Sequence, residues 1–306
     1  MKNKFLICIA GPTAIGKTAL SIKLANAFHT EIISADSRQF FKEMQIGTAA
    51  PSKSELAEAP HHFIHHLSIE DDYSVGDFEK EALQKVEDLF KKHDVLILVG
   101  GSGLYIKALL EGLDEFPEVA PEIRFGLNER LELEGLPVLQ QQLKELDPQY
   151  YTQIDINNPH RVIRALEISL ASGKPFSSFL NKPSKERNFK TIQIGLTADR
   201  EDIYDRINRR VDIMMDEGLM EEAQALYPKR KLNALNTVGY KEIFAFFEGR
   251  TDLETAVEEI KKNTRRFAKR QLTWFRKDKS ITWFDYTTPT SKITDFIEEE
   301  ISRYEA

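Results

Sequence analysis

The stretch IAGPTAIGKTAL, residues 9–20, decides the fold of this chain. Within it, Gly11 to Thr18 match G-x-x-x-x-G-K-[ST], the pattern of a loop whose backbone N–H groups surround a phosphate chain. The apolar run at 5–10 predicts a buried strand before the loop, and a helical pattern opens at its end. Strand, loop and helix follow in the required order, so the sequence predicts a phosphate site at the carboxyl end of this strand.

Short apolar runs predict the rest of a sheet. There are five, at residues 5–10, 31–35, 94–100, 191–197 and 281–286. Helical patterns separate the first three runs, and this alternation favours parallel strands with helices on both faces. The expected helices lie at 17–28, 75–92, about 200–227, 238–248 and about 253–277.

The segment at 114–188 differs from the rest of the chain. It is charged, contains no convincing strand, and its helical patterns are interrupted by Gly and Pro. We expect an inserted helical subdomain at 114–188 that binds something large, within a core formed by 1–113 and 189–306. A few extra surface helices are the alternative interpretation.

Composition sets further limits. The chain has 306 residues, of which 41% are hydrophobic and 30% charged, as in a globular protein. No apolar run approaches the roughly 18 residues that span a bilayer. The single cysteine, Cys8, excludes an intramolecular disulfide and favours a cytoplasmic location.

The charge is unevenly distributed. The net charge is −7, yet residues 264–279 contain seven Lys or Arg and one Asp. Lys262, Arg266, Lys269 and Arg276 fall on one stripe of the expected helix, with aromatic residues interleaved. A solvated helix face is the default interpretation of such a run. Because only one sign of charge is present, we favour contact with nucleic acid.

An acidic residue stands in an unexpected place. In nucleotide-hydrolysing enzymes with this loop, Lys17 would reach the terminal phosphates and the Thr18 hydroxyl would bind Mg²⁺, with a carboxylate after another strand. The run at 94–100 ends in glycines and serine without a carboxylate. Asp36 follows the second run instead. We expect a catalytic carboxylate there, with a helix cap or loop residue as the alternative.

Eight segments together resemble the bacterial tRNA dimethylallyltransferases. They are GPTAIGKT, IISADSRQFFKEMQIGTAAPS, PHHF, YSVGDF, LVGGSGLYIKALLEGL, NPHRVIRALEI, TVGYKEI and AKRQLTWFRK, and they span residue 7 to about 285. The resemblance implies an α/β fold, a P-loop NTPase-like parallel sheet flanked by helices, with an insertion that contacts the tRNA anticodon arm. It implies prenyl transfer from dimethylallyl diphosphate to N6 of adenosine 37 by a monomer, with pyrophosphate released.

The resemblance also implies roles for individual residues. Asp36 would be the general base, and Thr13, Lys17 and Arg210 would stabilise the leaving diphosphate, with Arg209 as the neighbouring alternative to Arg210. The loop that holds the diphosphate would be Gly11, Pro12, Thr13, Ala14, Ile15, Gly16, Lys17 and Thr18, with Mg²⁺ at Thr18. The expected tRNA contacts are Asp36, Ser37, Arg38, Gln39, Ser102, Arg124, His160, Arg161, Val162, Ile163, Arg164, Asn236, Thr237, Val238, Gly239, Tyr240, Lys241 and Lys269.

Other functions share parts of this pattern. A nucleoside or nucleotide kinase would not need the insertion or the basic helix. An adenylate isopentenyltransferase would run the same chemistry on free nucleotides without long anticodon-binding segments, and an RNA-binding ATPase switch would hydrolyse ATP without prenyl transfer. Histidines at 61, 62, 65 and 66 form i, i+4 pairs that could share a helix face, but we do not expect them to bind metal.

Overall fold

The computed structural model describes residues 3–180 and 185–305. The chain divides into two compact units. The core unit consists of Met1–Glu111 and Glu186–Ala306, and the inserted unit of Gly112–Lys185. The inserted unit thus begins two residues, and ends three residues, before the segment at 114–188 that the sequence indicated.

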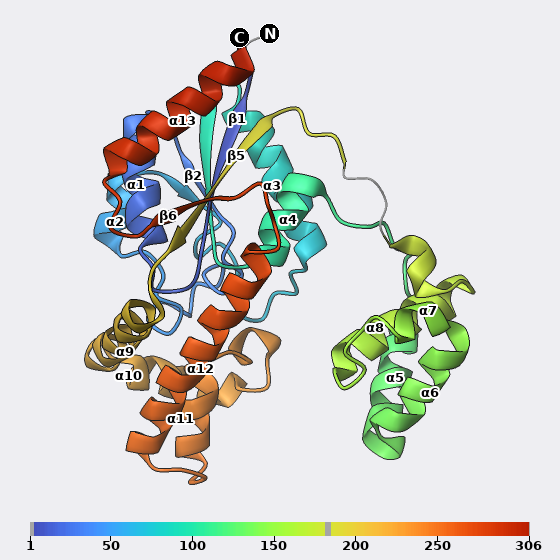
Figure 1. The fold of residues 1–306 in the computed structure, drawn as a ribbon. Coiled ribbons are helices and arrows are strands. Elements are labelled where there is room, and N and C mark those ends of the chain that lie inside the picture. The colour runs from blue at the N-terminus through green and yellow to red at the C-terminus, as the bar shows by residue number, and fades with distance from the viewer. Residues whose placement is uncertain (1–2, 181–184, 306) are drawn as a thin grey trace. The chain divides into compact units, whose positions relative to one another are not determined.

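A parallel sheet forms the centre of the core unit (Figure 1). Its strand order is β3-β2-β4-β1-β5-β6 and every neighbouring pair is parallel. The strands are β1 (Phe5–Ala10), β2 (Ile32–Ser34), β3 (His61–His62), β4 (Val95–Val99), β5 (Lys190–Thr197) and β6 (Thr282–Asp285). The five predicted strands are therefore confirmed. The edge strand β3 was not predicted, because two histidines carry no apolar signal.

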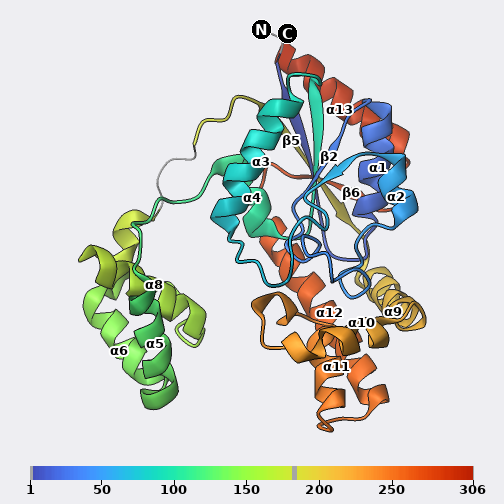
Figure 2. The ribbon, with the colours of Figure 1, turned by 180° about the vertical axis from the view of Figure 1, so that it is seen from behind.

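Side chains of β1 alternate between two apolar layers, as the two-residue period of a strand requires. Phe5, Ile7 and Ile9 pack with α1 (Lys17–Ala27) and α13 (Thr290–Glu305). Leu6 and Cys8 pack on the other face with α3 (Val75–Leu89) and α4 (Gly103–Glu111). Figures 1 and 2 show these two pairs of helices on opposite sides of the sheet. The short helix α2 (Lys53–Glu58) precedes β3.

A helical cluster within the same unit has an apolar core of its own. It contains α9 (Arg200–Asp216), α10 (Leu219–Leu226), α11 (Tyr240–Phe247) and α12 (Leu253–Phe275), with 3₁₀ turns at Tyr227–Lys229 and Asn233–Leu235. The sequence predicted one helix over about 200–227, whereas the structure has two, α9 and α10. The helical run is interrupted at Gly218, whose φ of +101° lies in the left-handed region that glycine tolerates.

The inserted unit is helical. It contains α5 (Pro121–Glu134), α6 (Leu136–Leu146), α7 (Pro148–Tyr151), α8 (Pro159–Ser172) and a 3₁₀ turn at Phe176–Phe179. Leucine, isoleucine and valine side chains from α5, α6 and α8 form its core. Within the ranges that the structure describes, no helix is long and apolar enough to cross a membrane.

Candidate active site

A cavity of about 420 Å³ lies against the phosphate loop. The loop supplies one wall, and the remaining walls come from the ends of β2 and β4, from the segment that follows Asp36, and from α9. The residues that face it are Thr13, Ala14, Ile15, Gly16, Lys17, Thr18, Ala19, Ser34, Asp36, Gln39, Thr48, Ala49, Pro51, Glu55, His61, Ile64, Val99, Gly100, Arg206, Arg209, Arg210 and Ile213. The cavity thus brings together the predicted diphosphate loop, the predicted base and the two candidate arginines.

The loop adopts a compact turn before α1. Gly16 caps the helix with φ +106°, a conformation that side chains disfavour. The ammonium of Lys17 donates a hydrogen bond to the Pro12 carbonyl at 2.8 Å, which folds this side chain back across the loop. Burial lowers the pKa of Lys17 from 10.5 to about 8, an effect that nearby Asp36 opposes and Arg210 reinforces. The loop is therefore a cationic site with N–H donors, suited to an anion.

Two arginines of α9 contact the phosphate loop. The Arg210 guanidinium donates to the Thr13 hydroxyl, and Arg206 Nε donates to the Ala14 carbonyl at 2.7 Å. Arg209 instead pairs with Asp205, and its side chain is 74% exposed. Burial lowers the pKa of Arg210 to about 10, and Asp36 opposes this shift. Of the two candidate arginines, Arg210 is therefore the one fixed at the loop, where Arg206 is fixed as well.

Asp36 lies just past the carboxyl-terminal end of β2. Its Oδ1 accepts the backbone N–H of Arg38 at 3.2 Å, which closes a tight local turn. Its Oδ2 faces Gly101, where a Cβ would lie 3.6 Å away. The carboxylate therefore has a structural contact through one oxygen and a second oxygen directed toward the glycine-rich end of β4.

Gln271 is a site residue that sequence reasoning missed. Its Oε1 accepts the backbone N–H of Thr13 at 2.8 Å, and its Nε2 donates to the Gly101 carbonyl at 2.9 Å. A side chain at Gly101 would collide with this amide. The buried amide thus joins α12 to both the phosphate loop and the end of β4. Its position on the inner face of the basic helix is the one sequence signal that could have indicated it.

The polar residues after Asp36 make contacts within the core unit. Ser37 meets Ser102 through their hydroxyls at 3.1 Å, and the Ser37 N–H donates to the same Ser102 oxygen. The Arg38 guanidinium donates to the carbonyls of Asn233 and Ala234. Since Gln39 likewise donates to backbone carbonyls, these side chains hold neighbouring loops in place, a role that the sequence did not indicate.

Some residues expected to touch tRNA are buried. Val162 and Ile163 are 0% and 3% exposed in the core of the inserted unit. Tyr240 is 0% exposed and donates a hydrogen bond to Glu222 at 2.7 Å, and Gly239 beside it is also buried. The side chains of Val162, Ile163 and Tyr240 point into apolar cores, because an amphipathic helix directs part of any sequence motif inward. The tRNA contacts expected at these positions stay predictions.

Other expected contacts lie at the surface. His160, Arg161, Asn236, Lys241 and Lys269 are exposed, while Thr237 and Val238 are half-buried. In the inserted unit, Glu167 is 1% exposed and forms ion pairs with Arg124 at 3.5 Å and Arg164 at 2.5 Å. Both arginine side chains remain partly exposed, at 55% and 44%. The fixed arginines are thus available to a polyanion.

The basic stripe of α12 is mostly exposed. Arg266, Lys269 and Arg276 are exposed, and Lys262 is half-buried and pairs with Glu259. The aromatic residues Phe267 and Trp274 are 40% and 44% exposed on the same helix. This surface combines charge with aromatic rings, as nucleic-acid interfaces do.

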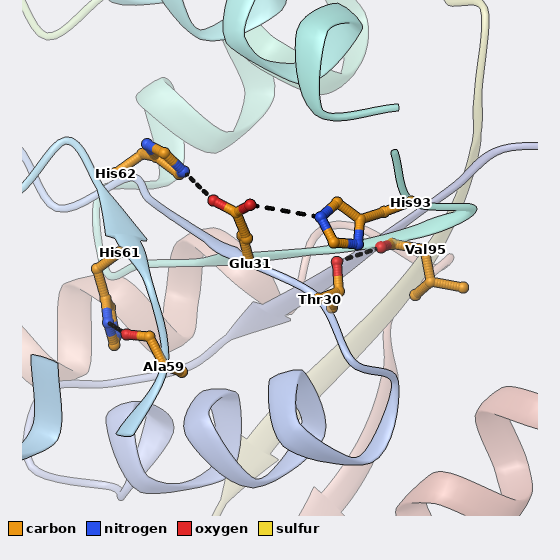
Figure 3. Close-up of polar contacts among 7 residues, drawn as sticks. All are labelled: Thr30, Glu31, Ala59, His61, His62, His93 and Val95. Carbon is orange, nitrogen blue, oxygen red and sulfur yellow. Dashed lines mark hydrogen bonds and ion pairs between the residues drawn. The ribbon is translucent and has the colours of Figure 1, made fainter. Parts of the chain in front are cut away.

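The four histidines do not share a helix face. His61 and His62 form β3, and the His62 ring contacts the Glu31 carboxylate at 2.7 Å (Figure 3). His93 approaches the other Glu31 oxygen at 3.4 Å. Although burial opposes it, the contacts with His62 and His93 lower the pKa of Glu31. Among the residues that the structure describes, no group of three or more His, Cys, Asp or Glu could hold a metal ion.

Comparisons with known proteins agree on one family. Residues 39–278 match the family model described as IPP transferase. The tRNA dimethylallyltransferase of Christiangramia forsetii is 66% identical over 98% of this chain and 99% of its own length. The crystal structure of the tRNA isopentenylpyrophosphate transferase from Bacillus halodurans superposes with a TM-score of 0.73 at 37% identity, covering 99% of each chain.

A eukaryotic relative is also similar. A eukaryotic dimethylallyltransferase, whose crystal structures were described as acting on tRNA, superposes with a TM-score of 0.81 at 28% identity. The match covers 97% of this chain and 80% of that one. The matches therefore extend over nearly the full chain. The chain belongs to the IPP transferase family, the family of the tRNA dimethylallyltransferases.

Proposed function

We propose that the chain transfers a dimethylallyl group from dimethylallyl diphosphate to N6 of adenosine 37 in tRNA. Family membership makes it a transferase that prenylates tRNA, and transfer to free nucleotides is not favoured. The observation that carries the finer proposal is the cavity itself, in which Lys17 and Arg210 stand beside the carboxylate of Asp36. Alkylation of an amine needs both kinds of group.

The proposed reaction has two charge requirements. The N6 nitrogen attacks C1 of the dimethylallyl group, the C1–O bond breaks, and the electron pair leaves with pyrophosphate. Lys17 and Arg210, which line the cavity, would stabilise the negative charge that develops there. The N6 proton passes to Asp36, so that the nitrogen ends neutral. The target base would have to leave its stack to reach this cavity.

The residues present fit a magnesium ion. Mg²⁺ prefers oxygen ligands and takes only one or two from the protein when substrate phosphates supply others. The Thr18 hydroxyl is an oxygen donor of this kind at the cavity. Thr18 would hold the ion, as the phosphate-loop pattern implies. When bound, Mg²⁺ would neutralise charge on the diphosphate.

The tRNA would contact one surface of each unit. In the inserted unit, Arg124, Arg164 and the exposed start of α8 would meet the anticodon arm. In the core unit, the exposed cations of α12 would contact phosphates, which position an RNA without reading its sequence. We further propose a monomer in the cytoplasm; the single buried Cys8 supports the cytoplasmic location.

A single substitution tests the proposed base. Asp36→Asn keeps the shape of the side chain but cannot take the proton, so single-turnover transfer should fall by at least about 10². Binding of tRNA and of dimethylallyl diphosphate should persist. Glu58→Gln, on the exposed surface of α2, is the matched control. Loss of binding with an unchanged single-turnover rate would show that Asp36 is a recognition residue and would overturn the mechanism.

A second measurement tests the donor. Calorimetric titration in Mg²⁺ with dimethylallyl diphosphate and, separately, with ATP should show tight binding of the first ligand only. The reason is that no carboxylate follows β4 to complete the metal site of an ATPase. Tight ATP binding with steady hydrolysis would contradict the proposal.

A further inference from the structure

Glu222, on α10, holds a segment that leads to the cavity wall. Its carboxylate accepts the backbone N–H groups of Gln45, Ile46 and Gly47 at 3.0, 2.8 and 2.9 Å. The hydroxyl of Tyr240 donates a fourth hydrogen bond at 2.7 Å. Hydrogen bonds to an ionised carboxylate are stronger than those between neutral groups. The segment 45–47 is therefore fixed to the helical cluster of α9–α12 through one side chain.

Tyr240 fixes the same segment by its shape. A Cβ at Gly47 would lie 2.6 Å from the Tyr240 ring, so the backbone here lies directly against the phenol. Tyr240 is 0% exposed. Burial, together with the neighbouring Glu222 carboxylate, raises the pKa of this phenol, which keeps its hydroxyl as a donor. Glu222 and Tyr240 thus act together on 45–47.

The next residues of the chain form a wall of the cavity. Thr48, Ala49 and Pro51 face it. The Gln39 amide donates to the carbonyls of Thr48 and Ala49 at 3.3 and 3.1 Å. This wall is consequently held at one end by Glu222 and along its length by Gln39. A displacement of 45–47 would move the wall.

The wall has a different chemistry from the phosphate loop. Ala49, Pro51, Ile64 and Ile213 contribute apolar surface to the cavity, whereas Lys17 and the α9 arginines contribute its positive charge. A donor that consists of a diphosphate and a short hydrocarbon needs both surfaces. Burial of the hydrocarbon against these apolar residues favours binding.

We propose that Glu222 and Tyr240 are positioning residues for the hydrocarbon of the prenyl donor, acting through the segment 45–47 and the wall that follows it. This inference rests on the proposed function, because it takes dimethylallyl diphosphate as the ligand. It assigns the buried tyrosine of the TVGYKEI segment to the donor site rather than to tRNA.

Two ligands separate this role from a general one. Dimethylallyl diphosphate senses the wall and the loop, whereas inorganic pyrophosphate senses the loop alone. Glu222→Gln and Tyr240→Phe should each weaken dimethylallyl diphosphate roughly 10-fold, since hydrogen bonds to a carboxylate are lost. Pyrophosphate and tRNA affinities should stay unchanged. Glu221→Gln, on the exposed neighbour in α10, is the matched control and should bind all three ligands normally.

The outcomes decide between clear alternatives. Equal loss of dimethylallyl diphosphate and pyrophosphate, loss of tRNA affinity alone, or no change would each overturn the inference. Tyr240→Phe keeps the ring, so it gives a folded variant if Glu222→Gln unfolds, as thermal unfolding would show. Failure of the unmodified protein to bind dimethylallyl diphosphate would contradict the proposed function itself, which distinguishes the two failures.

Discussion

The Arg210 guanidinium donates a hydrogen bond to the Thr13 hydroxyl across 197 residues of sequence. One residue lies on α9 and the other in the phosphate loop after β1. The contact fixes a cation at the loop. Preorganised charge of this kind needs little rearrangement when a leaving group develops its own charge.

Substitution of the two neighbouring arginines, one at a time, should affect the transfer rate differently. Arg210→Gln removes a donor fixed at the loop and should lower the transfer rate by about 10² to 10³, the range for loss of one preorganised donor. Arg209→Gln removes an exposed partner of Asp205 and should leave the rate near that of the unmodified protein. Single-turnover kinetics measure both. A larger effect at Arg209 would show that Arg209, and not Arg210, stabilises the leaving group.

Donor affinity should depend on the charge of Lys17. Its pKa of about 8 lies below the ordinary 10.5, so the free protein loses this proton as the pH rises through about 8. A bound diphosphate favours the ammonium, and the affinity is therefore highest below pH 8 and falls above it. Calorimetry at pH 7, 8 and 9 should show this fall. Lys17→Arg keeps its cation throughout and should give a flatter profile; a fall of the same size in that variant would implicate another group.

A core residue of the inserted unit separates packing from recognition. Ile163 is 3% exposed, so Ile163→Ala should reduce the free energy of unfolding of this unit by about 2–5 kcal/mol. His160→Ala, at the exposed start of α8, should leave stability unchanged. Denaturant titration checks both variants. A stable Ile163→Ala protein with reduced tRNA affinity would restore the original expectation of direct contact.

Binding of tRNA should depend strongly on salt despite the net charge of −7. If Lys269 neutralises a phosphate, Lys269→Ala should reduce the log–log salt slope by roughly 0.9, by analogy with duplex DNA. Lys262 is already paired with Glu259, so Lys262→Ala should change the slope less. Filter binding from low to high salt provides the measurement. An unchanged slope for Lys269→Ala would make this helix face a solvated surface.

The sheet could be predicted because its chemistry is local. Buried parallel strands need continuous apolar runs, and the phosphate loop needs a fixed spacing within eight residues. The two-residue strand β3 escaped this reasoning because its pairing with β2, rather than its own composition, makes it a strand.

The supporting residues of the site could not be predicted in this way. Gln271 meets Thr13 across 258 residues, and Glu222 meets Gln45 across 177. A polar residue on a helix carries no mark of such a distant partner. The same limit applies to the burial of Tyr240 and Val162. Their motifs indicated the right family but not which side chains turn inward.

The Gln271 amide has a thermodynamic consequence. It is the one side chain described above that contacts both the phosphate loop and the end of β4 while belonging to the basic helix. A shift of α12 on RNA binding would change the hydrogen bond between Gln271 and the Thr13 N–H. A ligand that accepts a hydrogen bond from the same N–H would break this bond to α12. Coupling between two binding sites is reciprocal. If binding of the prenyl donor changes the free energy of RNA binding through this amide, RNA binding changes the free energy of donor binding by the same amount.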